Sequence, residues 1–94
     1  MENIVYFELL RRGYRVNIGK IGNTEVDFVA RKNDEIIYYQ VTADMTSEET
    51  FEREMRPLKQ IRDNYEKIIL TLDKFSVGNY EGIKVINAVD WLME

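Results

Sequence analysis

The stretch that decides the fold covers residues 24–42 and reads T-E-V-D-F-V-A-R-K-N-D-E-I-I-Y-Y-Q-V-T. Residues 25–31 and 35–42 are rich in Val, Ile, Tyr, Phe and Thr, the residue types that favour β-strands. Asn33 and Asp34 lie between the two halves and have side chains typical of a tight turn. The stretch therefore predicts a β-hairpin with Asn33 and Asp34 at the centre of its turn. In this register, the residue numbers of each pair of facing residues add up to 67.

One face of this hairpin is expected to carry polar side chains. The register places Asp27 opposite Gln40 and Glu25 opposite Thr42. Because side chains alternate along a strand, all four point to the same side, together with Tyr38. The opposite face is almost wholly apolar and consists of Val26, Phe28, Ala30, Ile37, Tyr39 and Val41. The residues that we expect to be largely buried in the core are Phe28, Tyr39, Val41, Leu58 and Ile69.

Composition limits the chemistry that the chain can perform. Its 94 residues are enough for one domain, 1–94, with a single core. The chain has no Cys and no His, which excludes thiol and Ser-His nucleophiles and every metal site that needs either residue. Any metal would be held by oxygen ligands, which points to Mg²⁺ or a similar hard cation.

Charge and hydropathy limit the partners and the location. The net charge of −4 argues against a broad basic face that coats nucleic acid. No apolar run approaches the roughly 20 residues of a membrane span, and no signal peptide is visible, so we expect a cytoplasmic protein that does not bind membranes. The chain begins at Met1-Glu2 already inside an apolar-periodic helix, which suggests a piece of a longer protein.

The remaining elements follow from apolar periodicity and from helix and turn signals. In chain order we expect a helix (2–12), a strand (14–20), the hairpin strands (25–31 and 35–42), a helix (46–64), a buried strand (67–72), a polar loop (73–82), a strand (83–86) and a final helix (88–93). Thr46 and Glu49 form a capping box for the second helix, and Pro57 should kink it. The order α-β-β-β-α-β-β-α predicts an α/β fold, a mixed β-sheet flanked by helices.

This order, with these residues, resembles the PD-(D/E)xK nuclease-like superfamily, which has the restriction-endonuclease fold. The resemblance is carried by Glu2 in the first helix, Gly13-Tyr14 after it, E-V-D-F at 25–28 and Q-V-T at 40–42. The whole chain is also similar to the C-terminal domain of a prokaryotic AAA+-type ATPase family, in stretches such as E-N-I-V-Y-F-E-L-L-R-R-G-Y and D-N-Y-E-K-I-I-L-T-L-D. In that family the domain follows an N-terminal P-loop ATPase module.

The resemblance implies roles for four residues. Asp27 matches the metal-binding aspartate, Gln40 stands at the position of the second acid, and Glu2 matches a first-helix acid. These three form the implied catalytic and metal-binding set, at which Mg²⁺ would bind weakly. Thr42 stands at the position of the lysine, and its neutral hydroxyl cannot supply positive charge to a developing phosphorane. The implied site is therefore degenerate.

Simpler explanations stay open for three of these residues. Gln40 can be a polar strand residue that forms hydrogen bonds locally. Asp27 can instead be a strand acid that pairs with Lys20 or Lys32 at the surface. Glu2 can be an acid that the dipole at the start of a helix favours. On the helical wheel Glu2 falls with the apolar residues of its helix and Glu8 falls on the polar side, so Glu2 is the better site candidate.

Three functions are consistent with the sequence. The first is an accessory domain of an AAA+-type ATPase on a degenerate nuclease-like scaffold, which binds nucleic acid or docks to its own N-terminal ATPase module or another protein partner. The second is an active Mg²⁺-dependent deoxyribonuclease in which a lysine from elsewhere, such as Lys20, substitutes for Thr42. The third is a structural domain that forms a homodimer through an exposed strand edge. The missing lysine and the acidic composition favour the first.

Overall fold

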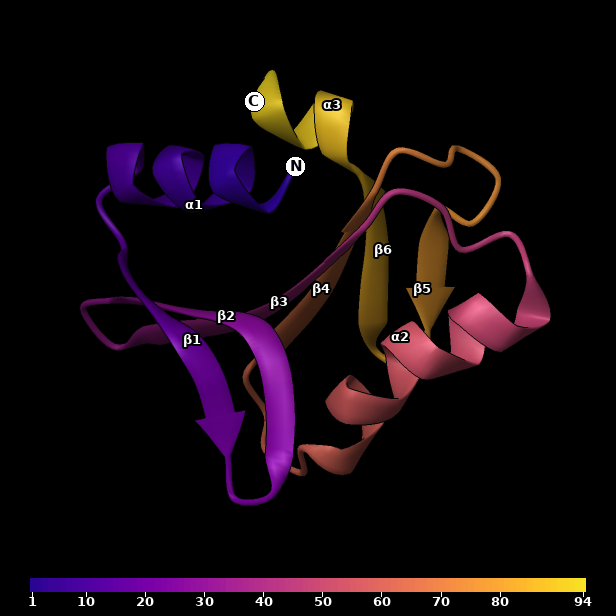
Figure 1. Cartoon of the computed structure of the whole chain (residues 1–94). Coiled ribbons are helices and arrows are strands. Elements are labelled where there is room, and N and C mark those ends of the chain that lie inside the picture. Colours follow the sequence, from indigo (N-terminus) through magenta and orange to yellow (C-terminus); the bar gives the residue numbers. More distant parts are fainter.

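The computed structural model describes all 94 residues, and the chain forms one mixed six-stranded sheet with helices on both faces (Figure 1). In chain order the elements are α1 (Glu2–Arg11), β1 (Arg15–Ile21), β2 (Thr24–Lys32), β3 (Glu35–Thr42), α2 (Glu48–Gln60), β4 (Glu66–Thr71), β5 (Gly78–Tyr80), β6 (Ile83–Asn87) and α3 (Ala88–Leu92). The strands lie side by side in the order β1-β2-β3-β4-β6-β5. The first three are antiparallel, and β4 runs parallel to both β3 and β6. The predicted α/β class with a mixed sheet is confirmed.

The predicted order of elements lacks one strand. Residues 73–82, which we expected to form only a polar loop, contain the short strand β5, which pairs antiparallel with β6 at the edge of the sheet. A three-residue strand with the sequence G-N-Y is too short and too polar to produce an alternating pattern. The observed order is therefore α-β-β-β-α-β-β-β-α.

The hairpin of β2 and β3 has the predicted register. Backbone partners run from Phe28 with Tyr39 to Lys32 with Glu35, and every pair sums to the predicted value. Asn33 adopts the left-handed conformation, with φ 56°, that a tight hairpin turn uses. The regular ladder ends at the first of these pairs, directly before the candidate site.

A bulge interrupts β2 beside that site. In the β1–β2 ladder, Asn17 faces Val29 but Gly19 faces Val26, so β2 has one residue more than β1 between these pairs. The bulge places Val26 in the same core as Val29, on the α2 side, and the prediction that Val26 shares a face with Phe28 is wrong. Gly19 permits the close approach, because a Cβ there would lie 2.3 Å from Val26 Cγ2.

Each face of the sheet carries a hydrophobic core. The first core packs α1 and α3 on the sheet, and the second packs α2 on the opposite face. The five predicted core residues are confirmed, at 8% exposure or less: Phe28, Tyr39, Val41, Leu58 and Ile69. The hairpin face that we expected to be polar is covered by α2, so Tyr38 and Gln40 are also buried, at 4% and 6% exposure. The prediction of only one apolar hairpin face is therefore corrected.

Helix α2 differs in detail from the prediction. Its cap is Ser47 rather than Thr46, and the Ser47 Oγ accepts a hydrogen bond from the Thr50 N–H at 3.2 Å. The helix is continuous through Pro57 and ends at Gln60, earlier than predicted. None of the three helices is both long and apolar enough to span a membrane.

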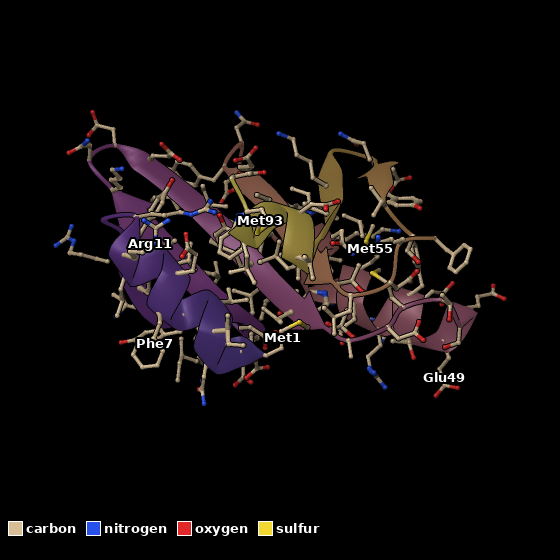
Figure 2. The ribbon with its side chains drawn as sticks, turned by 90° about the horizontal axis from the view of Figure 1, so that it is seen from above. Met1, Phe7, Arg11, Glu49, Met55 and Met93 are labelled. Carbon is tan, nitrogen blue, oxygen red and sulfur yellow. The ribbon has the colours of Figure 1, made fainter.

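Helix α1 is apolar on two sides. Val5 and Leu9 are fully buried against the sheet, whereas Ile4 and Phe7 are 57% and 65% exposed on the outer side. Figure 2 shows Phe7 projecting away from the body of the molecule. Leu10, which the helical wheel grouped with Leu9, is 41% exposed. The wheel therefore identified the buried side of α1 only in part.

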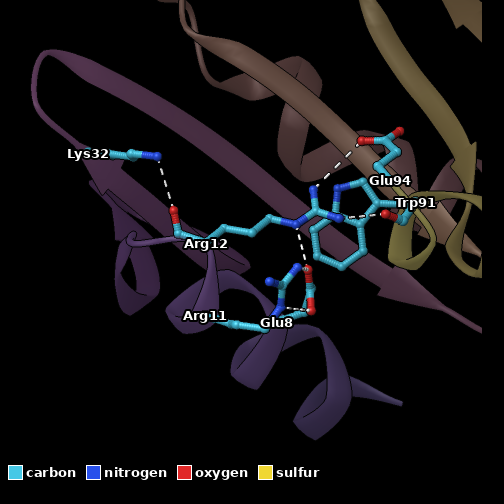
Figure 3. A network of polar contacts seen from close by, with 6 residues as sticks. All are labelled: Glu8, Arg11, Arg12, Lys32, Trp91 and Glu94. Carbon is cyan, nitrogen blue, oxygen red and sulfur yellow. Dashed lines mark hydrogen bonds and ion pairs between the residues drawn. The ribbon is translucent and has the colours of Figure 1, made fainter.

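Arg12 joins the end of α1 to α3 (Figure 3). Its guanidinium lies 4.3 Å from the centroid of the Trp91 ring, donates to the Trp91 carbonyl oxygen, and donates to Glu8 Oε2 at 2.7 Å. A longer ion pair of 3.7 Å reaches Glu94. Hydrogen bonds from Arg11 and Arg12 lower the pKa of Glu8 to about 2. This end of α1 is thus a cluster in which each acid has a cationic partner.

Candidate functional site

The candidate site is a pocket of about 790 Å³ at the start of α1. It is lined by side chains from α1, from β1 and from the bulged part of β2, and Gln40 of β3 closes it. The predicted residues Glu2, Asp27 and Gln40 all line this pocket, as does Glu25. The structure therefore brings together the three residues that sequence analysis grouped.

Asp27 and Gln40 are neighbours through their side chains rather than through the backbone ladder. The Asp27 N–H donates to Gln40 Oε1 at 2.8 Å, and the Val41 N–H donates to Asp27 Oδ2 at 2.8 Å. These two bonds bridge β2 and β3 where regular pairing has ended. Each side chain thus accepts a hydrogen bond from a backbone N–H beyond the end of the β2–β3 ladder.

Glu54 is a site residue that sequence analysis missed. It comes from α2, and its Oε1 accepts from Gln40 Nε2 at 3.4 Å. A signal was present, because Glu54 lies three residues after Phe51 and four before Leu58, inside the apolar stripe of α2. An acid at such a position faces the sheet, where it meets the polar side chain of Gln40.

Burial and nearby negative charge raise the pKa of two acids of the site, Asp27 and Glu54. Burial is the main cause of the raised pKa of Asp27, the nearby charge of Glu2 adds to it, and the hydrogen bond from Val41 partly offsets both. Burial also raises the pKa of Glu54, and the charge of Asp27 raises it further. No Lys or Arg lines the pocket. The pocket is therefore acidic, although Arg53 of α2 forms an ion pair of 3.8 Å with Glu54 beside it.

Thr42, which occupies the lysine position, and Lys20, which could substitute for that lysine, both lie outside the pocket. Thr42 is not among the lining residues, and its hydroxyl donates to the Asp44 carbonyl oxygen at 3.2 Å. Lys20 faces Glu25 across the β1–β2 ladder but does not line the pocket and forms no ion pair within 4.0 Å. No group of three or more acids is close enough together to hold a metal ion. Asp27, Glu2 and Gln40 line one pocket but do not form such a group.

A second groove, of about 760 Å³, lies between α2 and residues 75–80. Phe75, at its rim, is 92% exposed, and the rings of Phe51 and Tyr80 are in edge contact with centroids 4.9 Å apart. The charged residues of the groove are Glu48, Glu52, Arg56, Lys59 and Arg62. Acids lie toward the start of α2 and bases toward its end, so the groove carries both signs of charge.

Comparison with known proteins gives one informative match. No protein-family model matches the chain. A protein of Haemophilus influenzae that is described as uncharacterized is 48% identical over all 94 residues. The chain spans 23% of the length of this relative. The chain thus matches one region of this longer relative.

Proposed function

We propose that this chain is an accessory domain of an AAA+-type ATPase, built on a PD-(D/E)xK nuclease-like scaffold that no longer cleaves. It docks to its own ATPase module or to another protein partner. The observation that carries the proposal is the pair of hydrogen bonds that engage Asp27 and Gln40 with backbone N–H groups. The residues implied to hold a catalytic metal serve here to join two strands.

The scaffold assignment has support from the topology. A helix is followed by three antiparallel strands, and a helical crossover then leads to a strand parallel to the third. This is the arrangement that the resemblance implies, with the candidate acids where β2 and β3 separate. The match of the chain to one region of a longer relative is consistent with a domain that works beside others.

Cleavage of a phosphodiester needs positive charge at the developing phosphorane and an activated water. The pocket supplies neither, because no Lys or Arg lines it and Thr42 lies outside it. Glu2, Asp27 and the Gln40 amide oxygen would hold Mg²⁺ weakly, since Mg²⁺ usually keeps several waters and needs substrate phosphates to complete its shell. An active Mg²⁺-dependent deoxyribonuclease is therefore the less favoured function.

The groove on α2 favours a protein partner over nucleic acid. Protein interfaces are enriched in aromatic residues, Met and Arg, and this groove contains all three. Because Glu48 and Glu52 lie in the same groove as its basic residues, the groove is not the uniformly basic surface that binds a phosphate backbone. We therefore place protein docking before DNA binding as the role of the domain.

A nuclease assay tests the proposal. The unmodified chain, incubated with supercoiled plasmid and Mg²⁺ or Mn²⁺, is expected to leave the DNA intact. A rebuilt variant with Gln40→Glu, Thr42→Lys and Glu54→Gln restores the acid and lysine pattern and removes the charge that would oppose the new acid. Metal-dependent nicking by the rebuilt variant alone would support the scaffold assignment. Nicking by the unmodified chain that Asp27→Asn abolishes would overturn the proposal.

The ATPase context has its own test. The sequence next to these residues in the intact protein is expected to contain a Walker A motif, G-x-x-x-x-G-K-[ST], and the intact protein is expected to hydrolyse ATP. An intact protein without that motif and without ATP hydrolysis would remove the ATPase from the proposal. The nuclease assay would still test whether the scaffold is a degenerate nuclease.

A further inference from the structure

The two edges of the sheet differ in how well they are protected. The β5 edge is only three residues long, whereas β1 offers seven residues with one side unpaired. Short edge strands resist pairing with another chain, and long ones present a row of free N–H and C=O groups. Ile18, at the centre of β1, is 85% exposed. The β1 edge is therefore the one suited to accept another strand.

The side chains of β1 alternate between the two faces of the sheet. Val16 packs against the core on the α1 side, while Ile21 packs against the core on the α2 side. Gly19 approaches Val26 of the α2-side core. By alternation, Val16, Ile18 and Lys20 share the α1 side. Val16 and Ile18 line the acidic pocket on that side.

The sequence of β1 is compatible with antiparallel pairing to itself. If two copies meet with Ile18 opposite Ile18, Val16 of each copy faces Lys20 of the other, and Arg15 faces Ile21. No two like charges lie directly opposite, which matters because opposed like charges destabilise a strand pair. The aliphatic stem of Lys20 can lie over Val16 while its ammonium group reaches further.

The position of Lys20 in this arrangement gives the charge complementarity. Lys20 of the second copy stands beside Val16, which lines the pocket that contains Glu2, Glu25 and Asp27. The pocket has acids and no cation, and Lys20 is exposed and without an ion pair in its own chain. Lys20 of each copy can thus balance the negative charge in the pocket of the other copy.

We propose that a second copy of this chain pairs antiparallel with β1 about a two-fold axis at Ile18, and that Lys20 of each copy enters the acidic pocket of the other. Two-fold dimers are the commonest oligomers of soluble proteins, and such an interface is made of the same surface twice. The proposal goes beyond the accessory role argued above and does not depend on an ATPase or on loss of cleavage. It concerns what fills the acidic pocket.

Sedimentation velocity over a concentration series tests the dimer. The unmodified chain is expected to shift from monomer to dimer as concentration rises. Lys20→Glu should weaken self-association by about tenfold or more, because both inter-copy contacts change from attraction to repulsion. Ile18→Asp should do the same by placing two acids at the axis. The matched control Lys74→Glu changes an exposed lysine far from β1 along the chain and should have no effect.

Mixing two variants tests the lysine contact itself. Glu25→Lys reverses one charge of the pocket, so an equal mixture of Lys20→Glu and Glu25→Lys chains restores attraction at both contacts. The mixture is expected to dimerise more strongly than either variant alone.

Lys20→Gln, which adds no acid next to Glu25, provides a second variant. Thermal unfolding followed by circular dichroism shows whether each variant chain is folded. A wild-type chain that stays monomeric at millimolar concentration would overturn the proposal. So would a mixture no more associated than its components.

Discussion

Helix α1 has an acidic site at each end, and the two sites differ in how their charge is balanced. At the C-terminal end, Glu8 accepts hydrogen bonds from Arg11 and Arg12, and its pKa falls to about 2 (Figure 3). At the N-terminal end, Asp27 and Glu54 lie near Glu2 with no cation lining the pocket, and their pKa values rise. One helix therefore connects a balanced cluster to an unbalanced one.

The difference separates acids that stabilise the fold from acids that oppose it. An acid with a lowered pKa stabilises the folded state at neutral pH. An acid with a raised pKa destabilises the folded state when it is ionised. Asp27 and Glu54 are half-buried, and groups with perturbed pKa values are enriched at functional sites. The contrast distinguishes Glu8, whose charge stabilises the fold, from Asp27, whose ionisation is opposed by its surroundings.

The largest effect is expected at the balanced end. Arg12→Met should lower the free energy of unfolding by about 2–3 kcal/mol, because it removes charged hydrogen bonds to Glu8 and to the Trp91 carbonyl and the contact with the Trp91 ring. Arg11→Met, the neighbouring change at an exposed side chain, should cost far less, because exposed ion pairs contribute little to stability. Urea denaturation measures both. Equal losses for the two variants would mean that Arg12 does not hold α1 to α3.

At the other end, the hydrogen-bonding role of Asp27 can be separated from its charge. Asp27→Ala leaves the Val41 N–H without its acceptor and should cost about 1–3 kcal/mol. Asp27→Asn keeps an acceptor oxygen and removes a charge beside Glu2 and Glu54, so it should cost far less or increase stability at neutral pH. The comparison uses thermal or urea unfolding at pH 7. If the two variants are equally destabilised, the carboxylate charge itself is needed, and a cation must be close to it.

A smaller effect should appear at Glu54. Glu54→Gln keeps the acceptor oxygen for Gln40 and removes a charge near Asp27, so it should raise the free energy of unfolding by roughly 0.5 kcal/mol at neutral pH. The sign of the pH dependence follows from the raised pKa of Glu54. The folded state holds the proton more tightly than the unfolded state, so the contribution of this group is complete below the ordinary pKa of 4.5 and is lost as the pH rises through the raised value.

The advantage of Glu54→Gln should therefore grow with pH and vanish in acid. Unfolding measured from pH 3 to pH 8 tests this, with Glu52→Gln on the exposed side of α2 as the matched control. A constant difference between Glu54→Gln and the unmodified chain across that range would show that the charge of Glu54 is not the cause.

The sequence predicted most of the fold because the strongest patterns coincide with the strongest burial. The hairpin register follows from the turn residues and was confirmed, and the predicted core residues are buried. The grouping of Glu2, Asp27 and Gln40 also followed from the register and the helical wheel. The alternation of a regular strand could not reveal the bulge in β2, because the bulge depends on how β1 pairs with β2. The bulge moves Val26 to the other core.

The other differences also arise from tertiary contacts. The second face of the hairpin contains Tyr38 and Gln40 among charged residues, and only the position of α2 makes it a buried face. Glu54 joins the site for the same reason, although its place inside an apolar stripe was a visible sign. The network of Arg12 with Trp91 connects residues that lie 79 positions apart, and no local pattern indicates it.

The most direct test of the contrast is an NMR titration of the side-chain carboxyl groups of Glu8 and Asp27 in one sample. The account predicts that Glu8 titrates with a pKa of about 2, and that Asp27 titrates above its ordinary value of 3.8 because burial and the charge of Glu2 oppose its ionisation. A pKa of Asp27 below 3.8, moving together with that of Glu8, would show that a cation balances Asp27 within the same chain. The acidic pocket would then be a second cluster with balanced charge, and the contrast between the two ends of α1 would be wrong.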